Sequence, residues 1–347
     1  MKLDNYTAID TKIHGMRKHL LTSEKIEAHG EIRTLNELYA LITENPSYKK
    51  AADVLKTDVS SREDIELMLN YGNFFEFLKI YRFASLQQRA FLKRYAMFFE
   101  AWFIKHTLRT VDNRGETTVI MSPVTHYLDD NRGFKTTDLI MATDVKTVVD
   151  ALADTIYGPF FQQYSNLFSQ NDYDRYEFEI AFDQFVIQQI WQGGKKYLTG
   201  ESLTGFKKLF GARFDILNIF TIYRLKFLYQ LSDNEVTSAL VDGKYRLNNE
   251  YIDRLLQAPD IRNFEITVAE LGYGEIFEHL STDESLQKYE EDFLRSLQRH
   301  LATRAPKSMY AIINYLEDSR RALLMLEELT ERITYKNISP IERSLNQ

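Results

Sequence analysis

Apolar residues recur every three or four positions along most of this chain, the spacing that gathers side chains on one face of an α-helix. Residues 86–109 carry an aromatic stripe of this kind, formed by Phe91, Tyr95, Phe98, Phe99 and Trp102. Residues 283–301 and 308–333 carry similar stripes, whereas residues 206–230 are apolar nearly all round, which is typical of a helix buried on several sides. The pattern therefore predicts an all-α protein.

Helix-breaking residues are few, and they are grouped. The 347 residues include 14 glycines and 6 prolines, which suits long helices with few turns. Breakers and polar residues cluster at 112–137 and 232–249, so we expect domain boundaries in these two segments. Residues 192–205 predict a glycine-rich turn between two helices, and residues 117–121 have the character of a short strand or extended linker.

A tyrosine-anchored pattern occurs three times, with Tyr48, Tyr157 and Tyr273 placed 109 and 116 residues apart. Each tyrosine is followed by an acidic helix and then by a long aromatic-rich helix. Self-similarity at such a period indicates a small bundle that packs against copies of itself. We therefore expect three pseudo-repeated helical bundles with approximate threefold pseudosymmetry. Their expected bounds are 1–115, including an N-terminal helix; 116–235, including a linker; and 236–347.

Two of the long helices carry an acid nine residues before an arginine. The pairs are Glu100 with Arg109 and Asp215 with Arg224, and Asn218 follows the second acid by three residues. Nine residues at about 100° each place the two charges on opposite faces of a helix, so they cannot pair with each other. Each must find its partner on another element. Packing and inter-helix pairing is the favoured interpretation, and contact with a partner subunit is the alternative.

Two positions depart from this pattern. Phe103 stands in the first copy where the second copy has Asn218. In the third copy, Leu326 stands nine residues beyond Glu317, where an arginine would fall. The third copy is therefore degenerate, which argues against a role that needs three equivalent polar clusters.

The spacing of acid, asparagine and arginine resembles a recurring pattern in the C subunit of archaeal and bacterial A/V-type ATPases, which is equivalent to the d subunit of the vacuolar enzyme. Residues 6–16 and 20–22, and Pro306 followed by Tyr310, are similar to the same family. The resemblance covers essentially the whole chain.

This resemblance implies a funnel whose wide mouth receives the central-stalk rotor subunits and whose other face sits on the membrane proteolipid ring. The chain would be a non-catalytic adaptor of a rotary A-type ATP synthase or V-type ATPase, coupling ATP synthesis or hydrolysis to proton or sodium transport. It would lie in the cytoplasm, peripheral to the membrane.

Candidate chemistry is sparse. The chain has no cysteine, and no two of its 7 histidines are spaced as a helical pair of metal ligands. The glycines near residues 193–205 do not form a phosphate-binding loop. We therefore expect no catalytic site, no metal, no cofactor and no small-molecule substrate. A net charge of −7 argues against a nucleic-acid partner. The absence of a long uncharged apolar stretch predicts a soluble chain without a transmembrane segment.

Two other classes of function compete with the adaptor. An independent helical-repeat scaffold would gather soluble partners on a concave surface. An enzyme whose site is assembled from distant residues is a weaker possibility. Co-purification with stalk and proteolipid subunits distinguishes the adaptor from the scaffold, and a ligand-dependent rise in melting temperature would reveal the enzyme.

Overall fold

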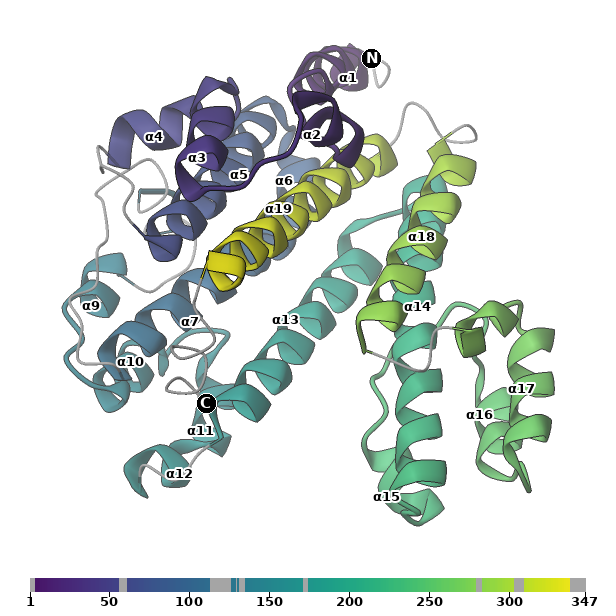
Figure 1. The fold of residues 1–347 in the computed structure, drawn as a ribbon. Coiled ribbons are helices and arrows are strands. Elements are labelled where there is room, and N and C mark those ends of the chain that lie inside the picture. Colours follow the sequence, from purple (N-terminus) through teal and green to yellow (C-terminus); the bar gives the residue numbers. More distant parts are fainter. Residues whose placement is uncertain are drawn as a thin grey trace. The chain divides into compact units, whose positions relative to one another are not determined.

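The computed structural model describes residues 4–55, 61–112, 126–128, 130, 135–170, 174–278, 283–302 and 309–337. Every regular element in these ranges is helical, which confirms the all-α prediction (Figure 1). The chain divides into two compact units, Met1–Asp183 with Tyr315–Gln347, and Gln184–Asn314. The division falls inside α13 (Arg175–Tyr197) and α19 (Met309–Asn337), so each of these helices contributes to both units.

The first unit contains the N-terminal helices, a run of short helices and most of α19. Its other helices are α1 (Asp4–Arg17), α2 (Ser23–His29), α3 (Leu35–Glu44), α4 (Lys49–Leu55), α5 (Arg62–Phe83), α6 (Leu86–Tyr95), α7 (Met97–Asp112), α9 (Thr136–Ile140), α10 (Val145–Leu152), α11 (Gly158–Gln163) and α12 (Ser165–Gln170).

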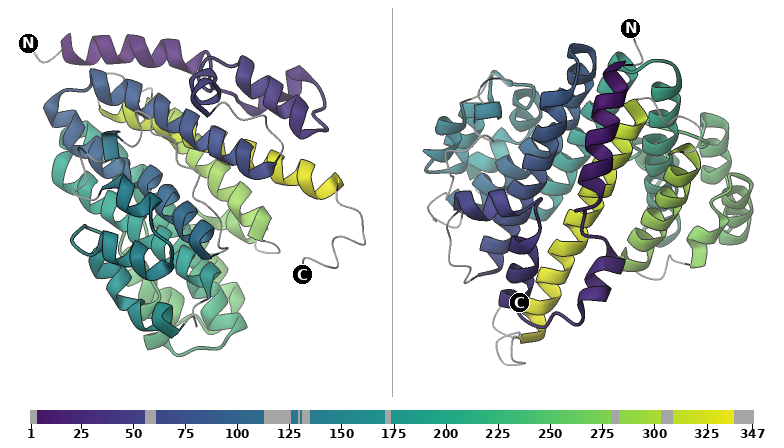
Figure 2. Two further views of the ribbon diagram at one scale, coloured as in Figure 1. Left: turned by 90° about the vertical axis from the view of Figure 1, so that its left-hand side faces the viewer. Right: turned by 90° about the horizontal axis from the view of Figure 1, so that it is seen from above.

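The centre of the first unit is α5, which is buried on nearly every side between Ile65 and Ile80. It begins at Ser61, whose side chain accepts a hydrogen bond from the backbone N–H of Asp64 in a reciprocal capping box. Helix α1 packs on α5 (Figure 2). An ion pair between Arg17 and Asp318 joins α1 to α19.

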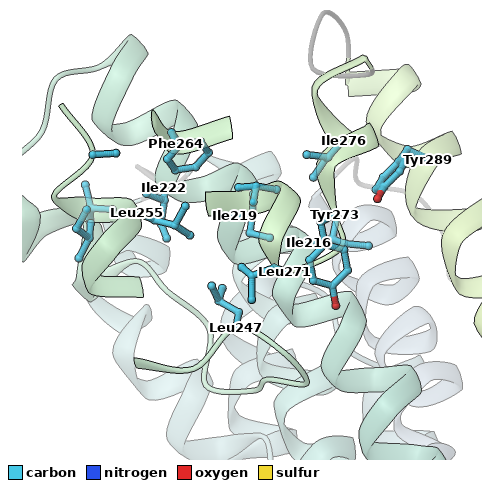
Figure 3. Close-up of a cluster of buried hydrophobic side chains, with 14 residues drawn as sticks. Ile216, Ile219, Ile222, Leu247, Leu255, Phe264, Leu271, Tyr273, Ile276 and Tyr289 are labelled. Atoms are coloured by element: carbon cyan, nitrogen blue, oxygen red, sulfur yellow. The ribbon is translucent and has the colours of Figure 1, made fainter. Parts of the chain in front are cut away.

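The second unit is organised around α14 (Gly200–Tyr223), which continues into a π-helical turn, Arg224–Leu228. Its other elements are α15 (Asp233–Ser238), α16 (Asn249–Leu256), α17 (Ile261–Glu270), a 3₁₀ turn (Gly274–Glu278) and α18 (Asp283–Ala302). Figure 3 shows its core, where Ile216, Ile219 and Ile222 of α14 pack with Leu255 of α16 and Phe264 of α17.

The helices predicted at 283–301 and 308–333 correspond to α18 and α19. The aromatic stripe at 86–109 is divided into α6 and α7, although Ala96 between them keeps helical dihedral angles. The glycine-rich turn expected over 192–205 is much shorter, since α13 ends at Tyr197 and α14 begins at Gly200. The strand-like segment, residues 117–121, lies outside the described residues.

Gly194 explains why that glycine-rich segment is helical. A Cβ atom at Gly194 would lie 1.9 Å from Cε1 of Phe206 on α14. The missing side chain therefore lets α13 and α14 pack closely, with Trp191 stacked on Phe206 at a centroid distance of 5.7 Å. The glycine serves the packing of two helices and not a turn.

Candidate functional site

Glu100 lies in the middle of α7 and is fully buried. The hydroxyl of Tyr157, in the turn before α11, donates a hydrogen bond of 2.5 Å to its Oε2 atom. The backbone N–H of Tyr157 in turn bonds to Oγ1 of Thr155 at 3.1 Å. Burying a carboxylate destabilises the folded state unless the carboxylate accepts hydrogen bonds. The pair therefore joins the long helix of the first predicted copy to the anchoring tyrosine of the second.

Asp215 of α14 is also fully buried, and it accepts four hydrogen bonds. Three come from consecutive backbone N–H groups, of Tyr245 at 3.0 Å, Arg246 at 2.6 Å and Leu247 at 3.1 Å. The fourth comes from the hydroxyl of Tyr273 at 2.9 Å. Burial raises the pKa of Asp215 above its usual range, although these hydrogen bonds oppose the shift.

The two acid–tyrosine bonds have nearly the same spacing along the chain. Glu100 and Tyr157 are 57 residues apart, and Asp215 and Tyr273 are 58 residues apart. In each case a carboxylate from the second long helix of one predicted copy reaches the anchoring tyrosine of the next. One such contact is described in each unit, and the threefold arrangement expected from the sequence stays a prediction.

The acid of the third predicted copy makes a different contact. Glu317 of α19 accepts a hydrogen bond of 2.9 Å from the hydroxyl of Tyr95 in α6. Two residues earlier, Tyr315 donates to Oε2 of Glu76 in α5 at 3.0 Å. Tyr48 is buried, and its ring packs directly against Gly72 of α5. A Cβ atom at Gly72 would lie 2.2 Å from Cδ1 of Tyr48. Buried acid–tyrosine bonds therefore also hold α19 to α5 and α6 within the first unit.

Asn218 lies three residues after Asp215 and faces the same loop. Its amide donates to the carbonyl oxygen of Val241 at 2.9 Å and accepts from the backbone N–H of Val241 at 2.8 Å. Asp215 and Asn218 together hold the loop between α15 and α16 at two points. Phe103, at the corresponding place in α7, is a buried apolar residue that cannot make such bonds.

Two glycines allow this loop to lie against α14. A Cβ atom at Gly211 of α14 would be 2.7 Å from the carbonyl oxygen of Lys244. A Cβ atom at Gly243 would be 2.2 Å from Cδ2 of Phe214. Any side chain at either position would push the loop away from the donors and acceptors of Asp215 and Asn218.

Arg224 begins the π-helical turn at the end of α14 and is half-buried. Its guanidinium lies 5.4 Å from the ring centroid of Phe220, a cation–π geometry. Among the residues that the structure describes, no carboxylate lies within ion-pair distance of Arg224. Asp215 is not its partner, as the nine-residue spacing requires. A π-helical turn is uncommon and is frequently associated with functional sites.

Arg109, the corresponding arginine of α7, forms a two-point ion pair with Glu179 of α13. Its Nε atom donates to Oε1 at 2.7 Å, and its Nη2 atom donates to Oε2. The hydrogen bond with Glu179 raises the pKa of Arg109. In the second unit, Arg213 of α14 similarly donates to Glu290 of α18 at 2.9 Å. Both acids belong to the acidic helices that follow the anchoring tyrosines.

Glu100, Asp215, Asn218 and Arg109 join their helices to other segments, whereas Arg224 contacts Phe220 of its own helix. Within the described ranges, no group of three or more His, Asp or Glu side chains is placed to hold a metal ion. None of the described helices combines the length and the apolar content that a membrane span requires. The five candidates from the sequence do not converge on one centre within either unit. Glu100 and Arg109 lie in the first unit, and Asp215, Asn218 and Arg224 lie in the second.

All five residues fall inside one continuous match to a known family. A family model described as the ATP synthase (C/AC39) subunit matches residues 9–326. The chain belongs to the ATP synthase (C/AC39) subunit family. The resemblance noted in the sequence is thereby confirmed, and the matched range includes both acid–tyrosine pairs.

Relatives from two organisms agree with this assignment to the C/AC39 family. The C subunit of the A-type ATP synthase of Methanosarcina acetivorans is 24% identical over 266 residues, which cover 72% of this chain and 67% of the relative. The C subunit of the A-type ATP synthase of Halobacterium salinarum is 28% identical over 123 residues, which cover 35% of this chain and 35% of the relative. The latter match spans about a third of either protein.

Some contacts of this C/AC39 family member were not predicted from the sequence. Glu76, Tyr95 and Tyr315 were not among the candidates, although each takes part in a buried hydrogen bond between distant segments. The available signal is a polar residue within an otherwise apolar helix. Glu76 lies among buried aromatic residues of α5, where a carboxylate needs a donor from elsewhere.

Proposed function

We propose that this chain is a non-catalytic central-stalk adaptor of a rotary A/V-type ATPase. It couples the rotor axle to the membrane proteolipid ring, for the transport of protons or sodium ions. Three related bundles, 1–115, 116–235 and 236–347, form a funnel with approximate threefold pseudosymmetry. The chain acts in the cytoplasm, at the membrane surface, as part of this complex.

The match to the C/AC39 family over residues 9–326 carries this proposal. The buried hydrogen bonds give it a physical basis, because an adaptor that transmits torque must resist internal slippage. Helices tied together by fully buried carboxylates cannot slide past one another without leaving donors or acceptors unsatisfied. The hydrogen bonds of Glu100, Asp215 and Asn218, and the ion pair of Arg109 with Glu179, support this part of the proposal.

Arg224 is the interface candidate among the five residues. Its guanidinium is half-buried against Phe220 and has no carboxylate partner in the described part of the chain. A charge held in this way is available to an acidic group on another subunit. Leu228 and Tyr229, four and five residues after it, are 60% and 59% exposed, which adds exposed apolar surface at the end of the same π-helical turn.

Size-exclusion chromatography with purified central-stalk subunits from the same source tests the proposal. We expect a stoichiometric complex with the chain, and incorporation of the proteolipid ring when it is supplied. Clean separation from both the stalk subunits and the ring at micromolar concentration would contradict the adaptor role and favour an independent scaffold.

A charge-reversal pair tests the role of Arg224. We expect Arg224→Glu to weaken the complex about tenfold or more, because an acidic partner group would then meet a like charge. The matched control is Arg254→Glu, since Arg254 is an exposed arginine of the same unit that pairs with Glu270. Equal affinities for the two variants would assign Arg224 a purely internal role.

A further inference from the structure

A groove of about 480 Å³ lies between α1 and the second half of α5, within the first unit. The residues Lys12, Gly15 and His19 follow one another at three- and four-residue spacing on the α1 side. Lys79 and Phe83 border it on the α5 side. The groove is shaped by a helix that is firmly attached, because Ile9, Ile13 and Met16 of α1 are buried and Arg17 pairs with Asp318.

The charge that this groove presents is positive. Lys12, Lys79 and His19 line it, and Glu76 is its acidic residue. The Glu76 side chain is only 4% exposed, and it accepts hydrogen bonds from Tyr315 and Lys79. Lys79 and Glu76 therefore offset each other, which leaves Lys12, 5.8 Å from the ring centroid of Phe83, as the net positive charge among the residues that line the groove.

One edge of the groove is apolar and exposed. The side chain of Phe83 is 58% exposed, and Leu86 across the α5–α6 turn is 84% exposed. The corresponding turn between α13 and α14 instead buries its leucine, Leu198, which is 5% exposed. Two large apolar side chains beside a cationic groove match the composition of a protein-binding surface.

Gly15 gives the most specific indication of a ligand. It lies inside α1, where glycine lowers helix stability relative to alanine. Apart from its chain neighbours and the nearby backbone of α1, a Cβ atom there would have no atom of the described residues within 4 Å. Gly72, Gly194 and Gly211 differ, because a Cβ atom at any of them would collide with a neighbouring residue. In the described part of the chain no contact requires glycine at this position, whereas close approach of another molecule to the α1 backbone would.

We propose that the groove between α1 and α5 is the docking site for an acidic peptide segment of another subunit in the same assembly. This segment lies against the α1 backbone at Gly15, places a carboxylate near Lys12 and Lys79, and packs an apolar side chain on Phe83. A concave surface suits a peptide segment better than a flat anionic membrane. The inference rests on the proposed function for the assembly in which the partner occurs.

Site-directed cross-linking identifies the partner segment. The chain has no cysteine, so His19→Cys introduces a single attachment site for a photoreactive benzophenone on the groove. The labelled full-length chain is assembled with the central-stalk subunits and the proteolipid ring, and the cross-linked peptide is sequenced by mass spectrometry. We expect a peptide with net negative charge and at least one large apolar residue.

Three variants test the geometry by biolayer interferometry. We expect Gly15→Leu and Lys12→Glu each to weaken binding of the cross-linked subunit about tenfold. His14→Leu is the matched control, because His14 is exposed on α1 but does not line the groove. Circular dichroism should show that all three retain the melting temperature of the parent chain within a few degrees.

The results of these experiments distinguish failure of the proposed adaptor role from failure of the proposed docking groove. If the parent chain forms no complex, the adaptor role and this inference both fail. If the complex forms but the cross-link joins a basic segment, a lipid or nothing, the inference alone fails. It also fails if Gly15→Leu binds as tightly as His14→Leu, or if vesicles containing phosphatidylserine bind the free chain through Phe83 and compete with the peptide.

Discussion

At the scale of single residues, the stability of a buried carboxylate depends entirely on the donors around it. Asp215 receives three backbone N–H groups and one tyrosine hydroxyl, and it therefore fixes a loop and an adjacent turn at once. Glu100 likewise joins α7 to the turn before α11, through the hydroxyl of Tyr157. We therefore expect the removal of Asp215 to lower stability strongly.

Asp215→Ala should lower the free energy of unfolding by about 3–5 kcal/mol, because it leaves several buried donors without an acceptor. Tyr273→Phe should cost less, about 1–2 kcal/mol, since it removes one donor and keeps the ring. Urea unfolding followed by circular dichroism measures both. The control is Asp253→Ala on the exposed face of α16, which should change stability by less than about 0.5 kcal/mol. A similarly small effect of Asp215→Ala would refute the structural role.

The pKa of Asp215 also predicts a dependence of stability on pH. Because burial raises this pKa above its ordinary value of 3.8, the folded state binds a proton more tightly than the unfolded state does. The contribution of Asp215 to stability is therefore greatest below that ordinary value and is lost as the pH rises through the raised pKa. Relative to Asp215→Asn, the parent chain should lose stability as the pH rises above about 4 and through the raised pKa of Asp215. A constant difference across this range in urea unfolding would contradict the prediction.

The identity of these acids was visible in the sequence, but their partners were not. Glu100 and Asp215 stand out as charges within apolar helices, which is a local pattern. Their tyrosines lie in loops more than 50 residues away, and nothing local specifies that pairing. The hydrogen bond between Tyr95 and Glu317 joins positions 222 residues apart, and it could not be predicted from the sequence for the same reason.

At the scale of helices, close packing depends on positions that cannot hold a side chain. Gly194→Ala should lower the free energy of unfolding by about 1–3 kcal/mol, because its methyl group would overlap the ring of Phe206 and separate α13 from α14. Gly15→Ala is the matched control. It introduces the same methyl group into a helix with open space around it, and it should raise stability by up to about 1 kcal/mol. If Gly194→Ala and Gly15→Ala changed the stability equally in thermal unfolding, helix propensity alone would explain both effects.

Helix positions followed well from apolar periodicity, since α18 and α19 occupy the expected residues. The ends of the helices and the π-helical turn could not be predicted from this periodicity. The glycines at 193 and 194 suggested a turn because glycine disfavours helices, yet contact with Phe206 requires a small residue inside α13. The π-helical turn at Arg224 likewise has no sequence signal, because its hydrogen-bond register depends on how α14 packs.

At the scale of the whole molecule, the two compact units share two uninterrupted helices, α13 and α19. Each unit also contains one of the chain's two tryptophans, Trp102 in the first and Trp191 in the second. The variants Trp102→Phe and Trp191→Phe therefore each report on one unit. We expect their fluorescence midpoints in urea to coincide with the midpoint from circular dichroism, because a shared helix cannot unfold in one unit alone without fraying the other. Separate midpoints would show that the units unfold independently.

The acid–tyrosine bonds have a consequence for how such a chain could arise. Each bond joins the end of one predicted copy to the beginning of the next, so a single copy cannot satisfy its own carboxylate. A fragment that stops after α7 would retain Glu100 and lack Tyr157. If the protein arose by gene duplication, the ancestral segment would have needed a second molecule to supply the tyrosine. In that case the segment that repeats would differ from the segment that folds, because each carboxylate would take its tyrosine from the neighbouring copy.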